Sequence, residues 1–225
     1  MNHSRYAALA CAVFTFALAG STQAAAQNEQ IIVGSTTIRG QAPVGTTITI
    51  TRCSYEASKE NIDACTQAIK HPSSYPLDLP QAYAKRGAAY MEMGKFREAV
   101  ADFDQALIYG PNADVYNNRC FARARMDGVL NAARSDCEKS LKLEPGKIYA
   151  LDSLAFVSFK QGDYVGAIAA YDGVLAQDPN YAPALYIRGV TKVRRGDFIN
   201  GHADINAARR ADPQIARTYF DVRPN

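Results

Sequence analysis

The chain of 225 residues has no tryptophan and only three histidines, His3, His71 and His202. No two of these histidines stand at the spacing of a metal-binding motif. The sequence also contains no nucleophile elbow, no phosphate-binding loop and no dinucleotide fingerprint. We therefore expect no enzymatic activity, no metal site and no cofactor.

Long apolar runs are missing after the first 26 residues, and no later stretch is long enough to span a bilayer. At the start of the chain, Arg5 precedes the apolar stretch Tyr6–Gly20, and small residues follow up to Ala26. This order predicts a secretory signal peptide over residues 1–26, cleaved after Ala26 or alternatively after Ala24. The alternative is a retained membrane anchor. After cleavage we expect no stable insertion into a membrane.

A strong excess of one charge is missing as well, because Lys plus Arg number 25 and Asp plus Glu number 22. Residues 182–225 hold eight basic and four acidic side chains, a modest local excess. Proteins that bind nucleic acids concentrate basic residues into a clear patch or stripe. We therefore expect no nucleic-acid partner, whereas an acidic protein is easier to attract.

Proline, in contrast, is present in a regular pattern. Pro111, Pro145, Pro179 and Pro213 stand 34 residues apart. A fixed period between about 20 and 50 residues is typical of a repeat array. Proline ends a helix because it lacks the N–H that a continuing helix needs. The spacing therefore predicts four repeats over residues 80–213, each closed by a proline.

The repeat that ends at Pro111 has two helical faces. Tyr83, Gly87 and Tyr90 share one face of a first helix, because they recur at helical spacing. Gly94 then interrupts the pattern. A second apolar face follows, made of Phe96, Ala99, Phe103, Ala106 and Leu107. The pattern predicts a helix, a tight turn and a second helix.

The same order of residue types recurs over residues 113–145, 148–179 and 182–213. This order of aromatic, small and aromatic residues, followed by alanine, an aromatic residue and proline, resembles the tetratricopeptide repeat. The resemblance implies an all-α fold, a right-handed α-solenoid of helix-turn-helix repeats. In that family the first helices line a concave face, so we expect this face to be the binding surface.

Three features depart from the family pattern. The tryptophan of the family's first helix is replaced in all four repeats, by Tyr83, Tyr116, Leu151 and Leu185. The second repeat has one extra residue near Met126–Gly128, which we place in the turn between its helices. Chaperone-binding members hold a carboxylate with Lys and Asn, where this chain has Ala84 and Ala88. Binding to the tail of a heat-shock protein is therefore not implied.

Two segments lie between the expected signal peptide and the repeats. Residues 27–52 are rich in Thr, Gly and Ile, and the alternation over Thr46–Thr51 fits one short strand. No partner strand is evident, so we expect an extended, mobile spacer. Residues 53–79 resemble a degenerate half-repeat that caps the array, with a helix over residues 56–70.

The end of the chain is predicted to cover the last repeat. Residues 214–225 are too few for another repeat but carry four apolar side chains, Ile215, Tyr219, Phe220 and Val222. A terminal repeat would otherwise expose the face on which the next repeat packs. If these side chains do not cover that face, it becomes a dimer or partner site.

Arginine and aspartate occur together within the repeats. Arg86, Arg119 and Arg188 precede the small residue of the first helix, and the matching second helices carry Asp102, Asp136 and Asp204. The third repeat has neither charge and carries Leu154 and Ala170 instead. Removing one partner strands a charge, whereas removing both does not. We therefore expect three partly buried Arg–Asp pairs and an apolar contact in the third repeat.

Cleavage of the signal peptide would remove Cys11 and leave four cysteines, an even number that suggests disulfides in an oxidising compartment. Three pairings are possible. Cys120 lies at the small-residue position of a first helix and Cys137 at the facing aromatic position, so these two positions touch in a helical hairpin. This favours Cys120–Cys137 and leaves Cys53–Cys65. The alternative is that Cys120 and Cys137 are buried thiols.

The expected concave face carries apolar side chains away from the packing stripe: Met91, Phe121, Phe156, Phe159, Tyr186 and Val190. Exposed aromatic side chains on a groove indicate contact with a partner. Arg125, Lys160 and Arg194 occupy equivalent places in three successive repeats and would favour an acidic peptide or a free carboxylate. The alternative is that these cations only complement the helix dipoles.

The sequence thus predicts a non-catalytic scaffold or adaptor that binds a protein or peptide in its concave groove. The cysteines and residues 82–90 resemble exported tetratricopeptide proteins of Gram-negative bacteria, which implies a periplasmic or secreted protein. The alternative is a structural assembly subunit that associates with itself through convex or terminal faces. The sequence leaves the oligomeric state open.

Overall fold

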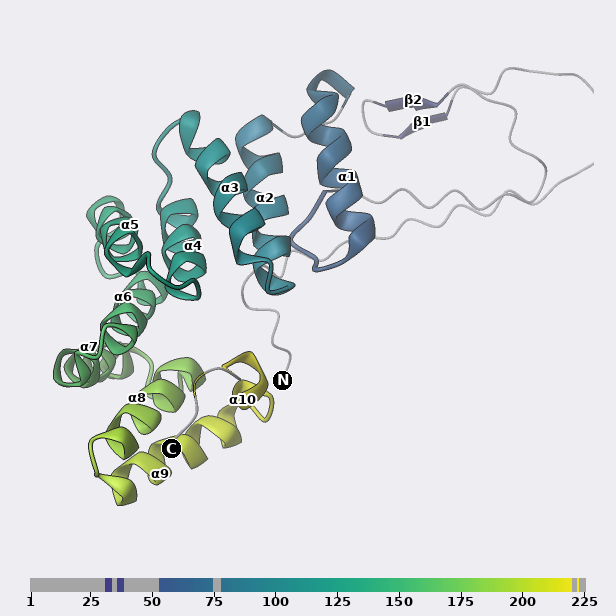
Figure 1. Ribbon diagram of the computed structural model, residues 1–225. Helices are drawn as coiled ribbons and strands as arrows, with labels where there is room; N and C mark the ends of the chain where they lie inside the picture. The colour runs from purple at the N-terminus through teal and green to yellow at the C-terminus, as the bar shows by residue number, and fades with distance from the viewer. Residues whose placement is uncertain (1–30, 34–35, 39–52, 75–77, 220–221, 223–225) are drawn as a thin grey trace, which may run out of the picture. The chain divides into compact units, whose positions relative to one another are not determined.

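The computed structural model describes residues 31–33, 36–38, 53–74, 78–219 and 222. These residues belong to two compact units, one ending at Tyr109 and one beginning at Gly110 (Figure 1). The predicted signal peptide lies outside the described residues. Within the described part of the chain, no helix is long and apolar enough to cross a membrane.

The N-terminal unit contains a small hairpin and three helices. Its elements are β1 (Ile31–Val33), β2 (Thr36–Ile38), α1 (Lys59–Lys70), the short 3-10 helix η1 (Pro72–Ser74), α2 (Leu79–Glu92) and α3 (Phe96–Ile108). The strands are antiparallel, with Ile31 opposite Ile38. The predicted spacer therefore does contain paired strands, which the sequence analysis did not foresee. The strand proposed over Thr46–Thr51 lies outside the described residues.

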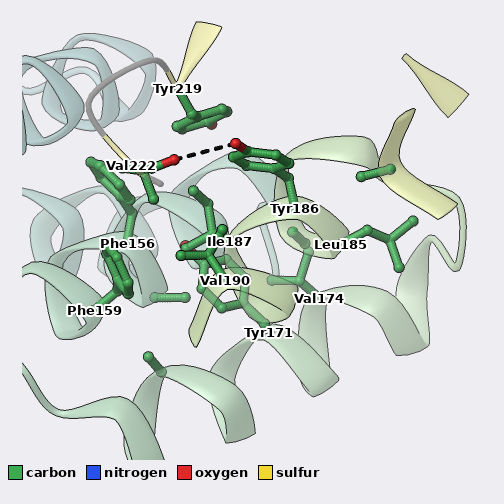
Figure 2. Packing of buried hydrophobic residues seen from close by; sticks show 14 of the residues in the cluster. Phe156, Phe159, Tyr171, Val174, Leu185, Tyr186, Ile187, Val190, Tyr219 and Val222 are labelled. Atoms are coloured by element: carbon green, nitrogen blue, oxygen red, sulfur yellow. Dashed lines mark hydrogen bonds between the residues drawn. The ribbon is translucent and has the colours of Figure 1, made fainter. Parts of the chain in front are cut away.

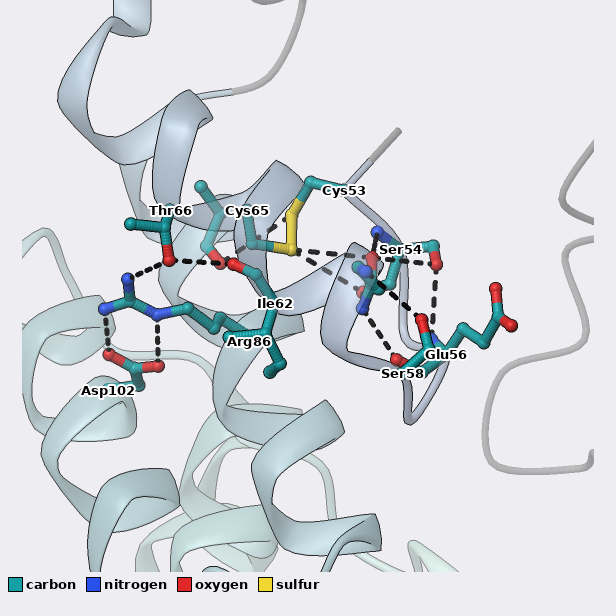
Figure 3. Close-up of a disulfide and its surroundings, with 11 residues drawn as sticks. Cys53, Ser54, Glu56, Ser58, Ile62, Cys65, Thr66, Arg86 and Asp102 are labelled. Carbon is teal, nitrogen blue, oxygen red and sulfur yellow. Dashed lines mark hydrogen bonds and ion pairs between the residues drawn. A yellow bond between two sulfur atoms is a disulfide. The ribbon is translucent and has the colours of Figure 1, made fainter. Parts of the chain in front are cut away.

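Helix α1 begins three residues later than the sequence suggested, because the preceding backbone is bonded to a side chain (Figure 3). Asn61 is fully buried, and its Oδ1 accepts from the Ser54 N–H at 2.6 Å. Its Nδ2 donates to the carbonyls of Ser54 and Glu56 at 3.0 and 2.7 Å. The Ser58 hydroxyl then caps the helix by accepting from the Asn61 N–H at 3.1 Å. These bonds compete with helical backbone bonds before residue 59.

The C-terminal unit is built from three helical pairs and a final helical turn. Its helices are α4 (Ala113–Ala124), α5 (Leu130–Leu143), α6 (Ile148–Lys160), α7 (Tyr164–Gln177), α8 (Ala182–Arg194), α9 (Phe198–Ala211) and α10 (Ile215–Thr218). The partners α4 and α5, α6 and α7, and α8 and α9 pack on each other, and each pair packs on the next (Figure 1). Helix α10 packs on α8 and α9.

The second helix of every repeat ends two or three residues before its proline, as predicted. These helices end at Ile108, Leu143, Gln177 and Ala211. The turn within the second repeat runs from Arg125 to Val129 and is longer than the three-residue turns of the other repeats, such as 161–163. This length accommodates the extra residue. Gly128, in the same turn, has a φ of 79°, which favours glycine.

A continuous core runs through the C-terminal unit (Figure 2). Tyr171, Val174 and Ile187 lie at its centre and are almost fully buried. The core extends from the second repeat, where Cys120 and Cys137 meet, to Val222 near the end of the chain. Burial of this apolar surface is the main source of stability for an array of helical pairs.

Helices α8 and α9 approach most closely at Gly189. A Cβ atom on Gly189 would lie 2.7 Å from the carbonyl oxygen of Gly201 and 2.8 Å from a side-chain carbon of Ile205. We expect Gly189→Ala to lower the free energy of unfolding by about 1–3 kcal/mol, because the helices must move apart. Chemical denaturation measures this change.

The matched control for this substitution is Gly173, which lies within α7 with open space around the position of a Cβ atom. Gly173→Ala should stabilise the protein by about 0.5–1 kcal/mol, since alanine has the higher helix propensity. Equal effects of the two substitutions would show that the close approach at Gly189 does not limit the packing.

Candidate functional site

All three predicted Arg–Asp pairs are present, and each is bidentate. The Nε and Nη2 atoms of Arg86 donate to Asp102 at 2.8 and 2.7 Å, and Nη1 donates to Thr66 at 2.9 Å (Figure 3). The hydrogen bond to Asp102 raises the pKa of the Arg86 guanidinium. Thr66 belongs to α1, so this pair also ties the capping helix to the first repeat.

The other two pairs recruit further charges. Arg119 donates to Asp136 at 2.8 and 2.6 Å, and Arg123 donates to the same carboxylate at 2.6 Å. Arg188 donates to Asp204 at 2.8 and 2.7 Å. Additional contacts join Lys192 to Asp204 and Arg188 to Asp172. These residues hold first and second helices together and are architectural rather than part of a binding surface.

The third repeat has a different polar residue from the one expected. Leu154 packs against the core, but Ala170 is exposed, so the predicted apolar contact is only half present. Asp152 on α6 is buried instead, and the Tyr181 hydroxyl donates to its Oδ2 at 3.5 Å. Burial raises the pKa of Asp152 to about 7. The only sequence signal was an acidic residue in the one first helix that lacks the arginine.

The cysteines are paired in the way that the sequence favoured. Cys120 is joined to Cys137 across α4 and α5, with Cα atoms 5.4 Å apart. Cys53 is joined to Cys65 of α1, with Cα atoms 4.4 Å apart (Figure 3). The first bond links the two helices of one repeat, and the second fixes the start of the capping segment.

The proposed groove residues do not form an open surface. Phe156, Phe159, Tyr186 and Val190 are buried, which corrects the expectation that they lie exposed. Phe121 is half-buried against the core. Met91 is half-buried and belongs to the N-terminal unit. The aromatic side chains thus face inward, and part of their cover comes from the end of the chain.

The C-terminal segment from Ile215 to Val222 lies against the first helices of three successive repeats (Figure 2). The Tyr219 ring lies 5.9 Å from that of Phe156 on α6 and 6.1 Å from that of Tyr186 on α8. The Arg125 guanidinium, at the end of α4, lies 5.8 Å from the Tyr219 ring. Tyr219 and Val222 are only 3% and 1% exposed.

Main-chain hydrogen bonds accompany these ring contacts. Arg125 donates to the Thr218 carbonyl at 3.3 and 3.4 Å. The Tyr186 hydroxyl donates to the Val222 carbonyl at 3.3 Å (Figure 2). The sequence suggested that these terminal residues cover the last hairpin, and Ile215 is indeed buried. Their extension to α4 and α6 was not foreseen, because it joins positions more than 60 residues apart.

The three cations of the predicted row lie at helix ends. Arg125 follows α4 as its C-cap, while Lys160 and Arg194 are the last residues of α6 and α8. Arg194 lies 4.8 Å from the centre of the Phe159 ring. Two of the three cations therefore contact aromatic rings of this chain. Lys160 is half-exposed, and among the described residues it has no ion pair.

A second apolar surface lies at the turns of the last two repeats. Tyr164, Val193, Arg194 and Phe198 line an open depression of about 460 Å³. Beside it, Phe198 is 60% exposed and the adjacent Ile199 is 85% exposed. Among the described residues, no group of His, Cys, Asp or Glu side chains could hold a metal ion.

These features define an array of helical hairpins with repeated small-residue contacts and prolines. The family model of the tetratricopeptide repeat matches residues 80–113. The remaining pairs follow the same plan at the same spacing, and solved tetratricopeptide structures share the fold. The chain is therefore a tetratricopeptide repeat protein.

Curated relatives match over part of their length. The chain is 36% identical over 87 residues to Sperm-associated antigen 1 of Rattus norvegicus, which covers 39% of this chain and 10% of that protein. It is 35% identical over 101 residues to the Hsp70-Hsp90 organizing protein of Triticum aestivum, covering 44% and 17%. The chain thus spans less than a fifth of the length of these relatives.

Solved structures share the fold at low identity. YrrB, described as a tetratricopeptide protein with an unusual peptide-binding site, is 20% identical, with a TM-score of 0.51 over 72% of this chain and 83% of YrrB. A thermophilic tetratricopeptide protein of Thermus thermophilus is 15% identical, with a TM-score of 0.59 over 72% and 89%. MamA of Desulfovibrio magneticus is 17% identical, with a TM-score of 0.55 over 72% and 86%.

Proposed function

We propose that this protein is a scaffold in the cell envelope that binds a protein segment on the inner surface of its C-terminal unit. By inner surface we mean the site formed by Phe121, Arg125, Phe156 and Tyr186. The observation that carries the proposal is that these side chains, from α4, α6 and α8, converge on one peptide segment. Aromatic and arginine side chains are the usual anchors of protein interfaces.

The chemistry of the inner surface fits a peptide better than a small substrate. Arg125 and Tyr186 donate to main-chain carbonyls, which every peptide offers. Lys160, beside them in the repeat order, adds a positive charge that favours an acidic residue or a free carboxylate. The similarity to Hsp70-Hsp90 organizing proteins does not extend to chaperone binding, because Ala84 and Ala88 stand at the clamp positions.

Photo-crosslinking in the native cell tests the proposed function. A photoreactive residue at Lys160 should capture a partner that the same residue at Glu138, exposed on α5, does not capture. Lys160→Glu should reduce co-purification of that partner without changing the melting temperature. Equal capture from both positions would contradict binding at the inner surface. Phe156 is unsuitable for this test because its substitution would damage the core.

The proposed envelope location rests on the predicted signal peptide and on the paired cysteines. We expect the exported protein to contain no free thiol when it is alkylated in denaturant and weighed by mass spectrometry. Reduction of each disulfide should lower the free energy of unfolding by about 3 kcal/mol, because each closes a loop of similar length. Four alkylated cysteines in freshly isolated protein would contradict an oxidising location.

Self-association is the second candidate function, and the exposed side chains of Phe198 and Ile199 favour it. A dimer formed through this surface should dissociate when Ile199 is replaced by Lys. Sedimentation velocity at increasing concentration measures this change. A chain that stays monomeric throughout removes this candidate.

A further inference from the structure

We propose that residues 219–222 act as a built-in, displaceable ligand of the inner surface, and that the partner inserts an aromatic side chain in place of Tyr219. The proposal rests on the proposed function, because it names the kind of segment that the same site receives. The partner segment carries Tyr or Phe, followed three residues later by an aliphatic residue, as Tyr219 is followed by Val222.

The contacts of the tail show what the site recognises. One aromatic ring lies between Phe156 and Tyr186 and beneath the Arg125 guanidinium. Ring pairs and cation–π contacts of this kind contribute about 0.5–1.5 kcal/mol each. The remaining bonds reach the carbonyls of Thr218 and Val222, which carry no side-chain information. Any peptide with the same ring and backbone course could make the same contacts.

The tail is held more weakly than the repeats. Helix α10 has four residues, far fewer than the 12 to 14 residues of α4 to α9. The Arg125 bonds to Thr218 are long and exposed to solvent. Few backbone bonds and a terminal position are typical of segments that open locally while the rest stays folded. A partner can therefore replace the tail without unfolding the array.

The position of the tail also explains why it reaches the site. Helix α10 begins two residues after Pro213, close to where a fifth repeat would begin, since α8 begins three residues after Pro179. Helix α10 ends after one turn, and the chain then continues to the rings of Phe156 and Tyr186. Without this segment, those rings would be left facing solvent, which apolar surfaces disfavour.

The test uses the complete chain and a synthetic peptide of residues 214–225. The opened variant is Tyr219→Ala/Val222→Ala, which weakens the hold of the tail on its own site. We expect the labelled peptide to bind this variant at least tenfold more tightly than it binds wild type, because a tethered tail competes at about millimolar effective concentration. Fluorescence anisotropy measures both affinities, and the helicity of the variant is checked by circular dichroism.

Two controls identify the site. A peptide with Tyr219→Ala should lose at least tenfold in affinity for the opened variant, and Arg125→Glu in that variant should weaken the wild-type peptide. Equal binding of the peptide to wild type and to the opened variant would overturn the proposal. So would a failure to bind either chain while both remain folded. A wild-type dimer that Tyr219→Ala abolishes would assign the site to a second copy and overturn the choice of partner.

Hydrogen exchange of the wild type gives an independent readout if the opened variant does not fold. The N–H groups of Tyr219 and Val222 donate to Ile215 and Tyr219 at 3.1 and 2.8 Å. They should exchange at least a hundredfold faster than the amides of α6 and α8. Exchange only by global unfolding would make the tail a fixed cap. If the opened variant and wild type captured the same partner equally through Lys160, the proposed function would stand and this inference would fall.

Discussion

Replacement of Asp136 by alanine should be among the most destabilising single changes in this protein. Its carboxylate is 1% exposed and accepts from both Arg119 and Arg123, so the substitution leaves two partly buried guanidinium groups without their shared partner. We expect a loss of about 3–5 kcal/mol in the free energy of unfolding, because a stranded buried charge is costly. Urea denaturation of the oxidised protein measures the loss.

The third repeat supplies a matched variant for this prediction. It carries Leu154, Ser158 and Ala170 at the positions of Arg119, Arg123 and Asp136. The triple substitution Arg119→Leu/Arg123→Ser/Asp136→Ala should therefore be more stable than Asp136→Ala alone, although it removes more contacts. Glu138→Ala, an exposed change in the same helix, should stay within about 0.5 kcal/mol of wild type. A triple variant less stable than the single one would show that the charges are not coupled.

The buried carboxyl of Asp152 should make stability depend on pH in the direction opposite to an ion-paired aspartate. Its folded pKa is raised to about 7 by burial, against about 4 in the unfolded chain. Below pH 4 the group is protonated in both states. Between pH 4 and 7 only the unfolded state loses its proton, so folding weakens as pH rises, and the loss is complete above pH 7.

Asp152→Asn should remove this dependence. A difference of about three pKa units corresponds to about 4 kcal/mol, so the variant should gain roughly that much on wild type between pH 4 and pH 8. Asp63→Asn, at an exposed position of α1, serves as the control and should show no such gain. Denaturant titrations across this pH range measure the difference. Parallel pH profiles for wild type and Asp152→Asn would contradict a neutral buried carboxyl.

The repeat architecture could be predicted from the sequence because it is written in local signals. The spacing of Pro111, Pro145, Pro179 and Pro213, and the helical spacing of the small and aromatic residues, each act within one repeat. The Arg–Asp pairs could be predicted for a related reason. Four copies of one motif in a single chain show which residues are gained and lost together.

The inner surface could not be predicted in the same way. Phe156 and Tyr186 were expected to be exposed because they lie away from the packing stripe of their own repeats. Their cover includes Tyr219, which lies outside the repeats and has no periodic signal. The late start of α1 has a comparable origin, because the buried side chain of Asn61 bonds the backbone that precedes the helix. Periodicity reports faces within repeats and does not report contacts of a unique segment.

Hydrogen exchange of the complete protein, with and without the partner captured through Lys160, tests most directly whether the inner surface binds a protein segment. The account predicts that residues 215–222 lose protection when the partner binds, while α4, α6 and α8 become or remain protected. Unchanged exchange at residues 215–222, together with new protection on α5 and α7, would place the partner on the outer helices and contradict the account.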